Sequence, residues 1–485
     1  MNRPFHPHPI PLTGVAIGLC LSLAGCAGPV PATTAGTVAI PAAFKPPASL
    51  AAYPSAAAQP AGAWWRVFQD PVLDELAERA AAHNTRVDEA AARLAQARAL
   101  VQAAASQRQP QLSASAGAGR QGGPLVNAAG GSGTLLTLGV GASWEADLFG
   151  RQAAAGHAAA LDAEAAAAQL QGTRLAVQSE VAQHVLALRA IDAERALQRD
   201  TLAAWRASLQ ITEERRRLGG VGEPAVARAA ADVASAEAEA LALDRRRAEI
   251  EHALALLVGE AASTFALAER TTDTELPHIP TGIPSEVLVR RYDVTATQQR
   301  LRAAQARAGA AQAAWFPSLS LTASGGQASS ELSNLLAGSM RAWGVGALLS
   351  LPLLDGGRRD AARQQAQADL DLAAAQYRGQ VLLALQDVED QLAALQTLDG
   401  QAQAQQRAAA LAQRSAALTA SRERQGLASR LELLEARRHA LQSQRQWLQV
   451  MAAQRVATVA LIRALGGGWD DAAAQPIAQA LPSAS

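Results

Sequence analysis

Very few residues of this chain have the types and spacing that catalysis or metal binding requires. The histidines beyond residue 10 are scattered, with no second histidine four residues away and no nearby cysteine, so we expect no metal site. Gly117, Gly119 and Gly122 match the Gly-x-Gly-x-x-Gly pattern of nucleotide-binding loops, but Gly123 and Pro124 follow and no helix begins there. The sequence also lacks a serine elbow and a phosphate-binding loop. We therefore predict a protein that is not an enzyme.

Cys26 is the one side chain whose surroundings indicate covalent chemistry. It follows an apolar stretch, residues 14–24, that is too short to span a bilayer but suits a secretion signal. The run Leu-Ala-Gly-Cys that ends at Cys26 resembles the bacterial lipoprotein box, in which the signal is cleaved and the cysteine is acylated. An ordinary cleaved signal that happens to contain a cysteine is the alternative. We expect residues 1–25 to be a signal peptide and Cys26 to carry a covalent lipid, with no other cofactor.

The composition excludes several further classes of protein. The chain has 485 residues, 43 basic and 43 acidic side chains, 2 cysteines and 4% aromatic residues. Balanced charge argues against binding to nucleic acid, and two cysteines cannot form a disulfide framework. No apolar run reaches the length of about 18 residues that a membrane-spanning helix needs. Abundant alanine, with leucine, glutamine, arginine and glutamate, indicates long helices instead.

The second half of the chain repeats the first at an offset of 207 residues. The segment around Pro110 corresponds to the segment around Pro317, and further residues that punctuate the chain match at the same offset. These matching pairs are Arg151 and Arg358, Val181 and Val388, Gly219 and Gly426, and Gly259 and Gly466. We predict two copies of one unit, residues 63–261 and 285–468, with a connector over 262–284. A proline-rich linker (26–62) precedes them and a tail (469–485) follows.

Both copies have the same predicted order of elements. A helical stretch ends at a proline, two strands follow, and a very long helix then reverses at a tip into a return helix. The predicted ranges are 70–109, 111–122, 135–147, 151–217 and tip 218–224 in the first copy, and 286–315, 318–328, 341–352, 358–425 and tip 425–429 in the second. The long helices span roughly 100 Å each at 1.5 Å per residue, so they must pack as coiled coils. The arginine runs 215–217 and 245–247 are expected on their solvated surface.

The strands alternate between apolar and small or polar residues. The apolar faces of two of them are Leu136, Leu138, Val140, Ala142 and Trp144, and Trp343, Val345, Ala347, Leu349 and Leu351. Membrane strands of about 9–11 residues need this alternation, although a soluble sheet under helices would also show it. The aromatic residues near the strand ends are candidates for a membrane-interface girdle, or simply for packing: Trp144, Phe149, Trp315, Phe316 and Trp343. Four strands cannot close a barrel, whereas three chains would supply 12.

A family resemblance is carried by five segments in this order: Trp64–Pro71, Ala142–Arg151, Arg291–Val294, Leu351–Arg358 and Ala464–Trp469. In them the chain resembles the TolC/OprM-type outer membrane factors, in particular the NodT-like efflux lipoproteins. The resemblance implies a mainly α fold with membrane β: a homotrimer whose 12-stranded β-barrel, four strands per chain, continues into an α-helical periplasmic tunnel. It also implies an outer membrane channel that passively conducts substrates from a periplasmic adaptor and an inner-membrane pump of the RND type to the exterior.

The tips are where the resemblance places adaptor docking and gating. The candidate docking residues are Gly219, Gly220, Val221, Gly222, Gly426, Leu427 and Ala428. Glu432 and Glu435 fall where some members of the family carry an acidic ring at the tunnel entrance, which would concentrate cations. Ser429 and Glu432 also have the spacing of a capping box, which explains an acidic residue there without a ring. Ala225 and Ala428 replace the residues that lock the tips in the TolC pattern, so the closing contacts are not carried over.

Two alternatives to an efflux channel remain at the level of the sequence. One is the outer membrane duct of a type I protein secretion system. The other, from a different class, is a lipid-anchored periplasmic coiled-coil adaptor or scaffold. An adaptor should have one helical hairpin between soluble β-domains, whereas this chain has two hairpins, each preceded by a pair of strands.

Overall fold

A computed structural model describes residues 39–44, 63–122, 132–271, 276–277, 279, 284–336 and 341–467. Cys26, most of the linker 26–62 and the tail 469–485 lie outside the described residues. In chain order the helices and strands are η2 (Trp64–Phe68), α2 (Pro71–His83), α3 (Thr85–Ser106), β1 (Gln111–Gly122), β2 (Ser132–Ala146), α4 (Arg151–Arg217), α5 (Glu223–Leu257), α6 (Pro284–Arg290), α7 (Tyr292–Ala313), β3 (Ser318–Ser329), η3 (Leu332–Asn334), β4 (Arg341–Ser350), α8 (Arg358–Arg424) and α9 (Arg430–Ala464).

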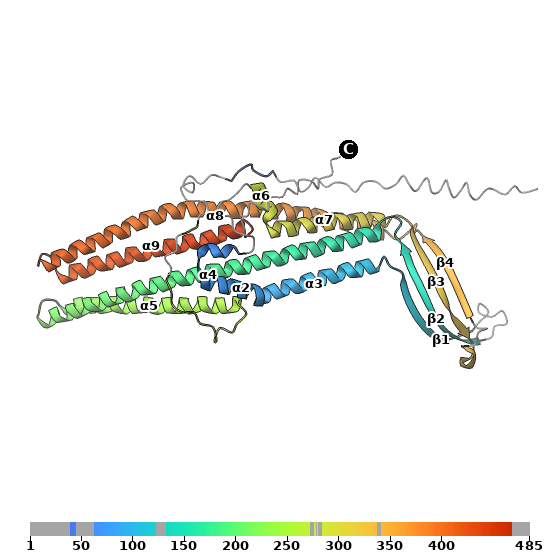
Figure 1. Ribbon diagram of the computed structural model, residues 1–485, viewed down its shortest axis with the longest axis horizontal. Helices are drawn as coiled ribbons and strands as arrows, with labels where there is room; N and C mark the ends of the chain where they lie inside the picture. The colour runs from blue at the N-terminus through green and yellow to red at the C-terminus, as the bar shows by residue number, and fades with distance from the viewer. Residues whose placement is uncertain are drawn as a thin grey trace, which may run out of the picture.

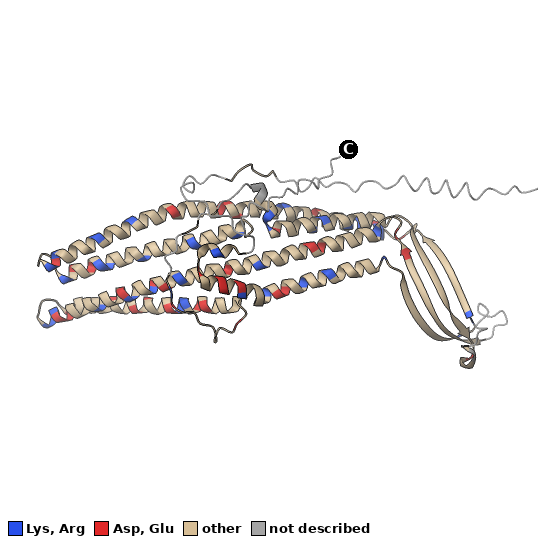
Figure 2. Ribbon diagram, viewed as in Figure 1, with Lys and Arg blue, Asp and Glu red and all other residues tan. Residues whose placement is uncertain are grey.

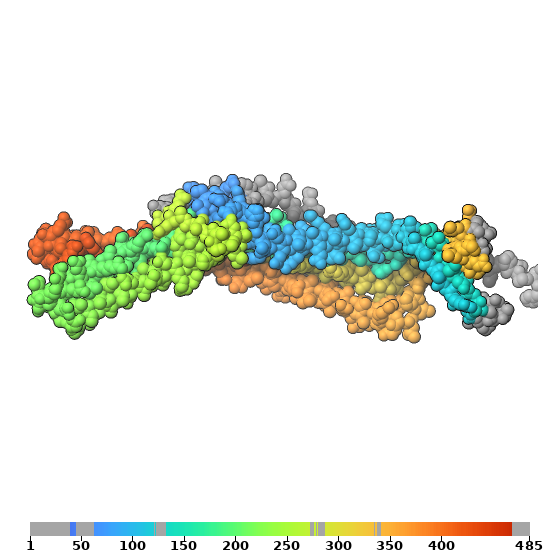
Figure 3. Space-filling model, turned by 90° about the horizontal axis from the view of Figure 1, so that it is seen from below, coloured from blue at the N-terminus to red at the C-terminus, as the bar shows by residue number. Residues whose placement is uncertain are grey.

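The molecule is long and narrow, with the sheet at one end and two helical hairpins at the other (Figure 1). Helices α4 and α8 run from the sheet to the tips. Helices α3 and α7 accompany them on the side of the sheet, and α5 and α9 return alongside them from the tips. The space-filling view shows the α4/α5 and α8/α9 hairpins emerging next to one another (Figure 3). All four connections between strands and helices lie at the same end of the sheet.

The duplication predicted from the sequence is confirmed by the element boundaries. Helices α4 and α8 contain 67 residues each, α5 and α9 contain 35 each, and α3 and α7 contain 22 each. Each member of a pair begins and ends 207 residues after its partner, as do strands β1 and β3. The four strands form one antiparallel sheet in the order β1-β2-β3-β4. The two copies therefore contribute two neighbouring strands each to a common sheet.

Two of the predicted helical stretches are each broken into two helices. We expected continuous helix over 70–109 and 286–315, but the backbone is extended at Asn84 (φ −76°, ψ 127°) and at Arg291 (φ −75°, ψ 123°). The Asn84 side chain caps the following helix by accepting a hydrogen bond from the Arg86 N–H at 2.9 Å. The strands differ less: β2 begins at Ser132, before the expected residue 135, and β4 ends at Ser350, before the expected residue 352.

The largest hydrophobic core lies at mid-length, where α2 and η2 cover α4. Its fully buried residues come from segments far apart in the sequence, including Trp64, Leu73, Val177, Leu188 and Ile462. Burying one such large apolar side chain contributes about 1.5–3 kcal/mol, so this cluster ties both copies together. Toward the tips the buried residues are mostly alanines, such as Ala412, Ala416 and Ala440, which let the helices approach closely.

No helix in the described part of the chain is both long enough and apolar enough to cross a membrane.

Candidate functional site

The two faces of the sheet differ sharply in chemistry. The register pairs Leu112 with Ala142, Ala142 with Ala323, and Ala323 with Val345, so these positions share one face across all four strands. The remaining large apolar residues on that face are Leu136, Leu138, Val140, Trp144, Leu319, Leu321, Trp343 and Leu349. Trp343 and Val345 are 82% and 77% exposed, which is unusual for side chains of this size. This face is a surface built to contact an apolar medium.

The opposite face carries mainly small and polar side chains, together with two leucines, Leu135 and Leu348. Its members include Ser113, Ser115, Gly117, Thr137, Gly139, Gly141, Ser143, Ser318, Ser320, Thr322, Ser324, Gly344 and Gly346. Glu145 is the only charged residue of the described strands on this face, and it pairs with Arg151 at 2.6 Å where the sheet meets the helices. Figure 2 shows how little charge the strands carry compared with the helices. A wall of hydroxyl groups and backbone suits contact with water and with solutes of varied chemistry.

Strands β1 and β4 are the two edges of the sheet, and neither has a further partner strand among the described residues. Apolar surroundings give an unpaired backbone N–H or C=O no water to bond, so open edges are not tolerated in a membrane. A sheet with this apolar face therefore needs strands from other chains to complete it.

The aromatic residues at the strand ends divide into two groups. Trp144 and Trp343 lie on the apolar face, and the Trp144 indole N–H donates to the Arg108 carbonyl at 2.9 Å. Phe149 and Phe316 instead stack on one another, with 4.8 Å between ring centroids. Arg359 lies 4.8 Å from the centre of the Trp315 ring. The latter three aromatic residues pack where the sheet joins the helices, as the packing alternative proposed.

The core contains a buried ion pair between Asp70 and Arg189. Their side chains are 7% and 2% exposed, and the Arg189 Nε donates to Asp70 at 3.0 Å. Burial alone would raise the pKa of Asp70, but the bonds from Arg189 and from the Val72 and Leu73 N–H groups outweigh it and hold the pKa below its usual value. Asp70 thus begins α2 and fastens it to α4. Its sequence signal was its place in the Trp64–Pro71 segment of the family resemblance, without an assigned role.

Equivalent positions in the two copies make the same contact with different side chains. In the first copy the Asn84 Nδ2 donates to the Leu257 carbonyl at the end of α5, at 2.8 Å. In the second copy the equivalent residue, Arg291, donates to the Ala464 carbonyl at the end of α9, at 3.0 Å. Each residue therefore connects the helix break before α3 or α7 to the end of the return helix, α5 or α9. Gly259 is packed so closely there that a side-chain carbon would lie 2.4 Å from the His83 carbonyl oxygen.

The arginine of each joint stands at a different position in the two copies. Arg86 pairs with Glu180 at 2.7 Å in the first copy. The equivalent residues of the second copy are both acidic, Asp293 and Asp387, and Arg291 bridges them at 2.7 and 2.8 Å. The Arg291 side chain is 8% exposed. Burial would raise the pKa of Asp293, but the Arg291 guanidinium outweighs it and lowers that pKa.

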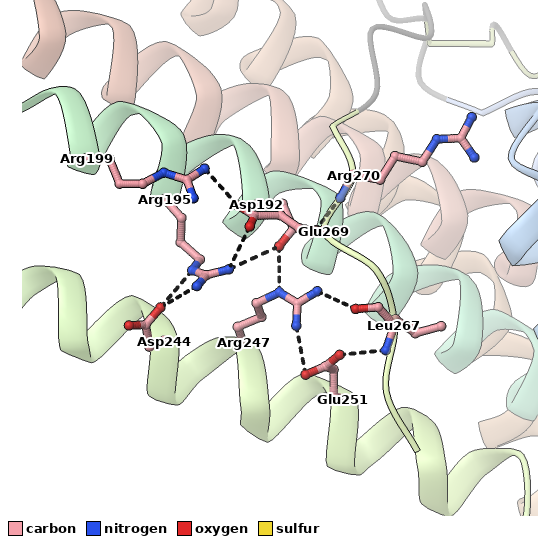
Figure 4. A network of polar contacts seen from close by, with 9 residues as sticks. All are labelled: Asp192, Arg195, Arg199, Asp244, Arg247, Glu251, Leu267, Glu269 and Arg270. Carbon is pink, nitrogen blue, oxygen red and sulfur yellow. Dashed lines mark hydrogen bonds and ion pairs between the residues drawn. The ribbon is translucent and has the colours of Figure 1, made fainter. Parts of the chain in front are cut away.

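The connector after α5 is fastened to the α4/α5 hairpin by a polar network centred on Asp192 and Arg247 (Figure 4). Asp192, which is fully buried, accepts from the Arg247 Nε at 2.7 Å and from the backbone N–H of Arg270 at 3.0 Å. Arg247 also donates to the Leu267 carbonyl at 2.8 Å and pairs with Glu251 at 2.8 Å. Further pairs surround this centre, among them Arg195 with Asp244 and Arg199 with Glu269.

This network corrects one expectation from the sequence. We predicted that the run 245–247 lies on a solvated helix surface, and Arg245 does, but the Arg247 side chain is only 13% exposed. The connector covers Arg247. Because the connector is not part of the helix, the helical spacing of residues 245–247 gives no sign that it packs there.

The hairpin tips repeat the same turn. Gly220 and Leu427 donate backbone hydrogen bonds to the carbonyls of Arg215 and Arg422, at 2.7 and 2.8 Å. The predicted docking residues lie in or beside these turns, and all of them are at least partly exposed. They are Gly219, Gly220, Val221 and Gly222 in one tip and Gly426, Leu427 and Ala428 in the other.

The acidic residues of the second tip begin α9. The Ser429 N–H donates to the Glu432 side chain at 2.8 Å and the Ser429 hydroxyl accepts from the Glu432 N–H at 3.2 Å, which completes the predicted capping box. Glu435 is exposed on the next turn. Arg438 lies over the Trp205 ring, 3.3 Å from its centre, and so ties α9 to α4 just behind the tip. The cap involves Glu432 alone and leaves the Glu435 carboxylate exposed, so the cap does not exclude an acidic entrance ring.

The described residues contain no group of three or more His, Cys, Asp and Glu side chains that could hold a metal ion.

Comparison with known proteins gives a consistent result for sequence and structure. The family model for outer membrane efflux proteins matches residues 76–260 and 283–467, which are offset by the same 207 residues as the helices. The chain is 34% identical to the outer membrane protein OprJ of Pseudomonas aeruginosa over 330 residues, which cover 68% of this chain and 69% of OprJ. It is 33% identical to the toluene efflux pump outer membrane protein TtgF of Pseudomonas putida over 335 residues, covering 69% and 70%.

Solved structures extend the likeness to the whole fold. The outer-membrane channel OprN matches with a TM-score of 0.80 and 30% identity, over 89% of this chain and 98% of OprN. The open state of the MtrE outer membrane channel of Neisseria gonorrhoeae matches with a TM-score of 0.77 and 26% identity, over 91% and 98%.

Proposed function

Because the chain belongs to the outer membrane efflux protein family, we propose that it is the passive exit duct of a tripartite pump, fed by a periplasmic adaptor and an inner-membrane pump of the RND type. Membership itself makes the chain a channel subunit of an efflux system in the outer membrane, extending into the periplasm. Type I secretion and a lipid-anchored scaffold are not favoured, because the relatives are efflux components and both copies match a channel family.

The fold of the family also indicates what completes the open sheet. Three chains contribute four strands each to a 12-stranded barrel, which continues into a helical tunnel. β1 of one protomer then meets β4 of the next, so both edges are paired and the apolar face turns toward lipid. The Ser, Thr and Gly face becomes the pore wall.

The observation that carries the proposal of a passive duct is this pore wall. It presents mainly hydroxyl groups and backbone, with two leucines, Leu135 and Leu348, and a single charged side chain of the described strands at its inner end, Glu145. Such a wall offers no tight binding site, so solutes of differing chemistry pass when an upstream pump drives them. Relatives are named for the efflux of toluene, solvents and antibiotics, and we extend this to small organic molecules as the substrates here.

Efflux of a small organic dye from intact cells tests the proposal. A host that lacks its own outer membrane channel should regain energy-dependent export when it expresses this chain with a compatible adaptor and pump. A trimer that conducts ions in planar bilayers but never restores export with any RND-type adaptor would contradict the proposed partnership. Purified trimers without conductance would contradict the duct itself.

We propose that the mature chain is attached to the membrane by a lipid on Cys26, on the strength of the Leu-Ala-Gly-Cys run alone. Cys26→Ala should abolish incorporation of labelled fatty acid, while Cys20→Ala, within the expected signal, should leave labelling unchanged. Labelling that persists in Cys26→Ala would refute the assignment.

We propose that the exposed tips dock the adaptor and that Glu432 and Glu435 form an acidic ring at the entrance. Three copies of each carboxylate would raise the local cation concentration. E432Q/E435Q should reduce the selectivity for cations over anions in single-channel recordings. The control E249Q removes an exposed carboxylate from α5 that pairs with Arg245 one turn away. Equal selectivity of E432Q/E435Q and wild type would leave Glu432 as a cap alone.

A further inference from the structure

Two arginines are the only charged residues of the described strands on the lipid-facing side of the sheet. Arg120 on β1 shares the face of Ala118 and Ala116, and Arg341 on β4 shares the face of Trp343. Both side chains are exposed. The rest of this face is uncharged along the described lengths of all four strands, so the placement of these two charges is specific.

Both arginines lie at the same end of the sheet, away from the helices. Arg120 is two residues before the end of β1, and Arg341 is the first residue of β4. Because the helices extend into the periplasm, this end faces the exterior of the cell. The apolar residues between this end and the helices cover about seven positions per strand, roughly 24 Å along the strand at 3.4 Å per residue. At a strand tilt of about 40° this is about 18 Å of bilayer depth, so the arginines lie near the edge of an apolar band of about 25 Å.

A charge on the lipid face costs about 2–4 kcal/mol at the middle of the bilayer but only about 0–1 kcal/mol near its surface. A long arginine side chain at the edge of the band can reach the headgroup layer while its stem stays in contact with apolar surface. The neighbouring Trp343 is typical of the same interface. The two arginines therefore lie at the level of the outer-leaflet headgroups.

Neither arginine forms an ion pair within the described part of the chain. Arg120 donates to the Ser132 hydroxyl, at 3.4 Å, and Arg341 stands opposite the neutral Gln327 in the β3–β4 register. The sequence has no acidic residue between 111 and 144, and Glu331, in the β3–β4 connection, is the only one between 318 and 350. Each protomer thus has an excess of positive charge at this end of the sheet.

The arginines also occupy the two edge strands. When the barrel closes, β1 of one protomer pairs with β4 of the next, so each of the three seams brings an Arg120 and an Arg341 to the same outward face and the same end. An arginine guanidinium can bind two phosphate oxygens at once, which a lysine cannot do. A pair of guanidiniums from two protomers suits a ligand that carries phosphate groups.

We propose that each seam of the trimer binds the phosphate groups of an outer-leaflet glycolipid through Arg120 of one protomer and Arg341 of its neighbour. The site is formed only when the barrel closes, so the proposal rests on the trimeric barrel and not on the adaptor, the pump or the transported substrate. Bound lipid would join neighbouring protomers from outside and strengthen the seam.

Native mass spectrometry of purified trimers in mild detergent tests this with bisphosphorylated lipid A as the probe. Wild type should bind up to three molecules per trimer, and R120Q/R341Q should bind at least about tenfold more weakly, the loss expected when charge-assisted phosphate contacts are removed. R120Q and R341Q alone should each show part of the loss. Lipid A without its phosphates should bind wild type no better than it binds R120Q/R341Q.

The matched control is R98Q/R245Q, which removes the same charge from exposed positions on α3 and α5 and should bind lipid A like wild type. Equal binding by R120Q/R341Q and wild type would overturn the proposal, as would tight binding of dephosphorylated lipid A. Phosphatidylglycerol binding with the same dependence on both arginines would overturn the choice of glycolipid. The same spectra report the trimer mass. Trimers that bind no lipid A but still conduct would refute this site alone, whereas monomers would refute the site together with the barrel.

Discussion

Exchanging the joint of the second copy for that of the first tests whether these residues hold the return helices in place. Arg291→Asn removes a guanidinium that is 8% exposed and leaves Asp293 and Asp387 facing one another. Removing one partner of a buried ion pair costs about 3–5 kcal/mol. The two aspartates are 41% and 42% exposed, so water recovers part of this, and we expect about 2–3 kcal/mol per protomer.

The expected shift in melting temperature follows from the chain length. Unfolding entropy of about 2.1 cal/mol/K per residue gives about 1 kcal/mol/K for this chain, so R291N should melt about 2–3 °C below wild type. Enthalpy and entropy both scale with the number of protomers, so trimerisation does not multiply the shift. Circular dichroism of the trimer in detergent, recorded in the helical band at a fixed scan rate, measures it.

The double variant R291N/D293R distinguishes this mechanism from simple loss of packing. It recreates the first copy, in which Asn84 bonds the Leu257 carbonyl and Arg86 pairs with Glu180. We expect it to recover more than half of the lost stability, because the introduced arginine would face Asp387 after the exchange. A double variant no more stable than R291N, or an R291N that melts like wild type, would refute the reasoning.

Three further outcomes are expected. Burial lowers the pKa of His184 below 6.5, so the unfolded chain takes up its proton first and stability should fall as pH drops below about 6.5; H184Q should flatten that slope in thermal scans. G326A should reduce trimer yield, because its new carbon would lie 2.4 Å from the Leu138 carbonyl oxygen, whereas G325A meets nothing within 4 Å and should assemble normally. D192N should speed amide hydrogen exchange at Arg270, whose N–H bonds that carboxylate.

The long elements could be predicted because local residues fix their ends. Pro110 and Pro317 precede the strands, and the tip glycines Gly219 and Gly426 adopt positive φ values of 74° and 73°. The repeat at 207 residues then provides each boundary twice. The alternation in the strands likewise predicted which residues share a face, because a period of two leaves no freedom once the pairing is set.

The two joints were missed for different reasons: Asn84 is a favoured N-cap residue whose local signal was overlooked, whereas Arg291 gives no such signal and its partner is distant in the sequence. The helical pattern continues across both positions, and each side chain also bonds a carbonyl 173 residues away. The burial of Arg247 depends in the same way on a connector that folds back over α5. The segment Arg291–Val294 was part of the family resemblance, which marked the place without explaining it.

Duplication explains why the two joints share a backbone and differ in charge. A trimer of duplicated chains has six similar helical hairpins around its tunnel, but each chain has one connector between its copies, and it follows α5. The first copy accordingly has Asp192 and Arg247 to hold that connector, while the equivalent positions of the second copy are Asp399 and Gln454. The α9 helix has contacts of its own: Arg291 bonds the carbonyl at its end, Arg445 pairs with Glu194 on α4 and Glu239 on α5, and Arg438 lies over Trp205 near the tip. Substitutions at Arg291 and Arg438 should therefore loosen α9 more than α5.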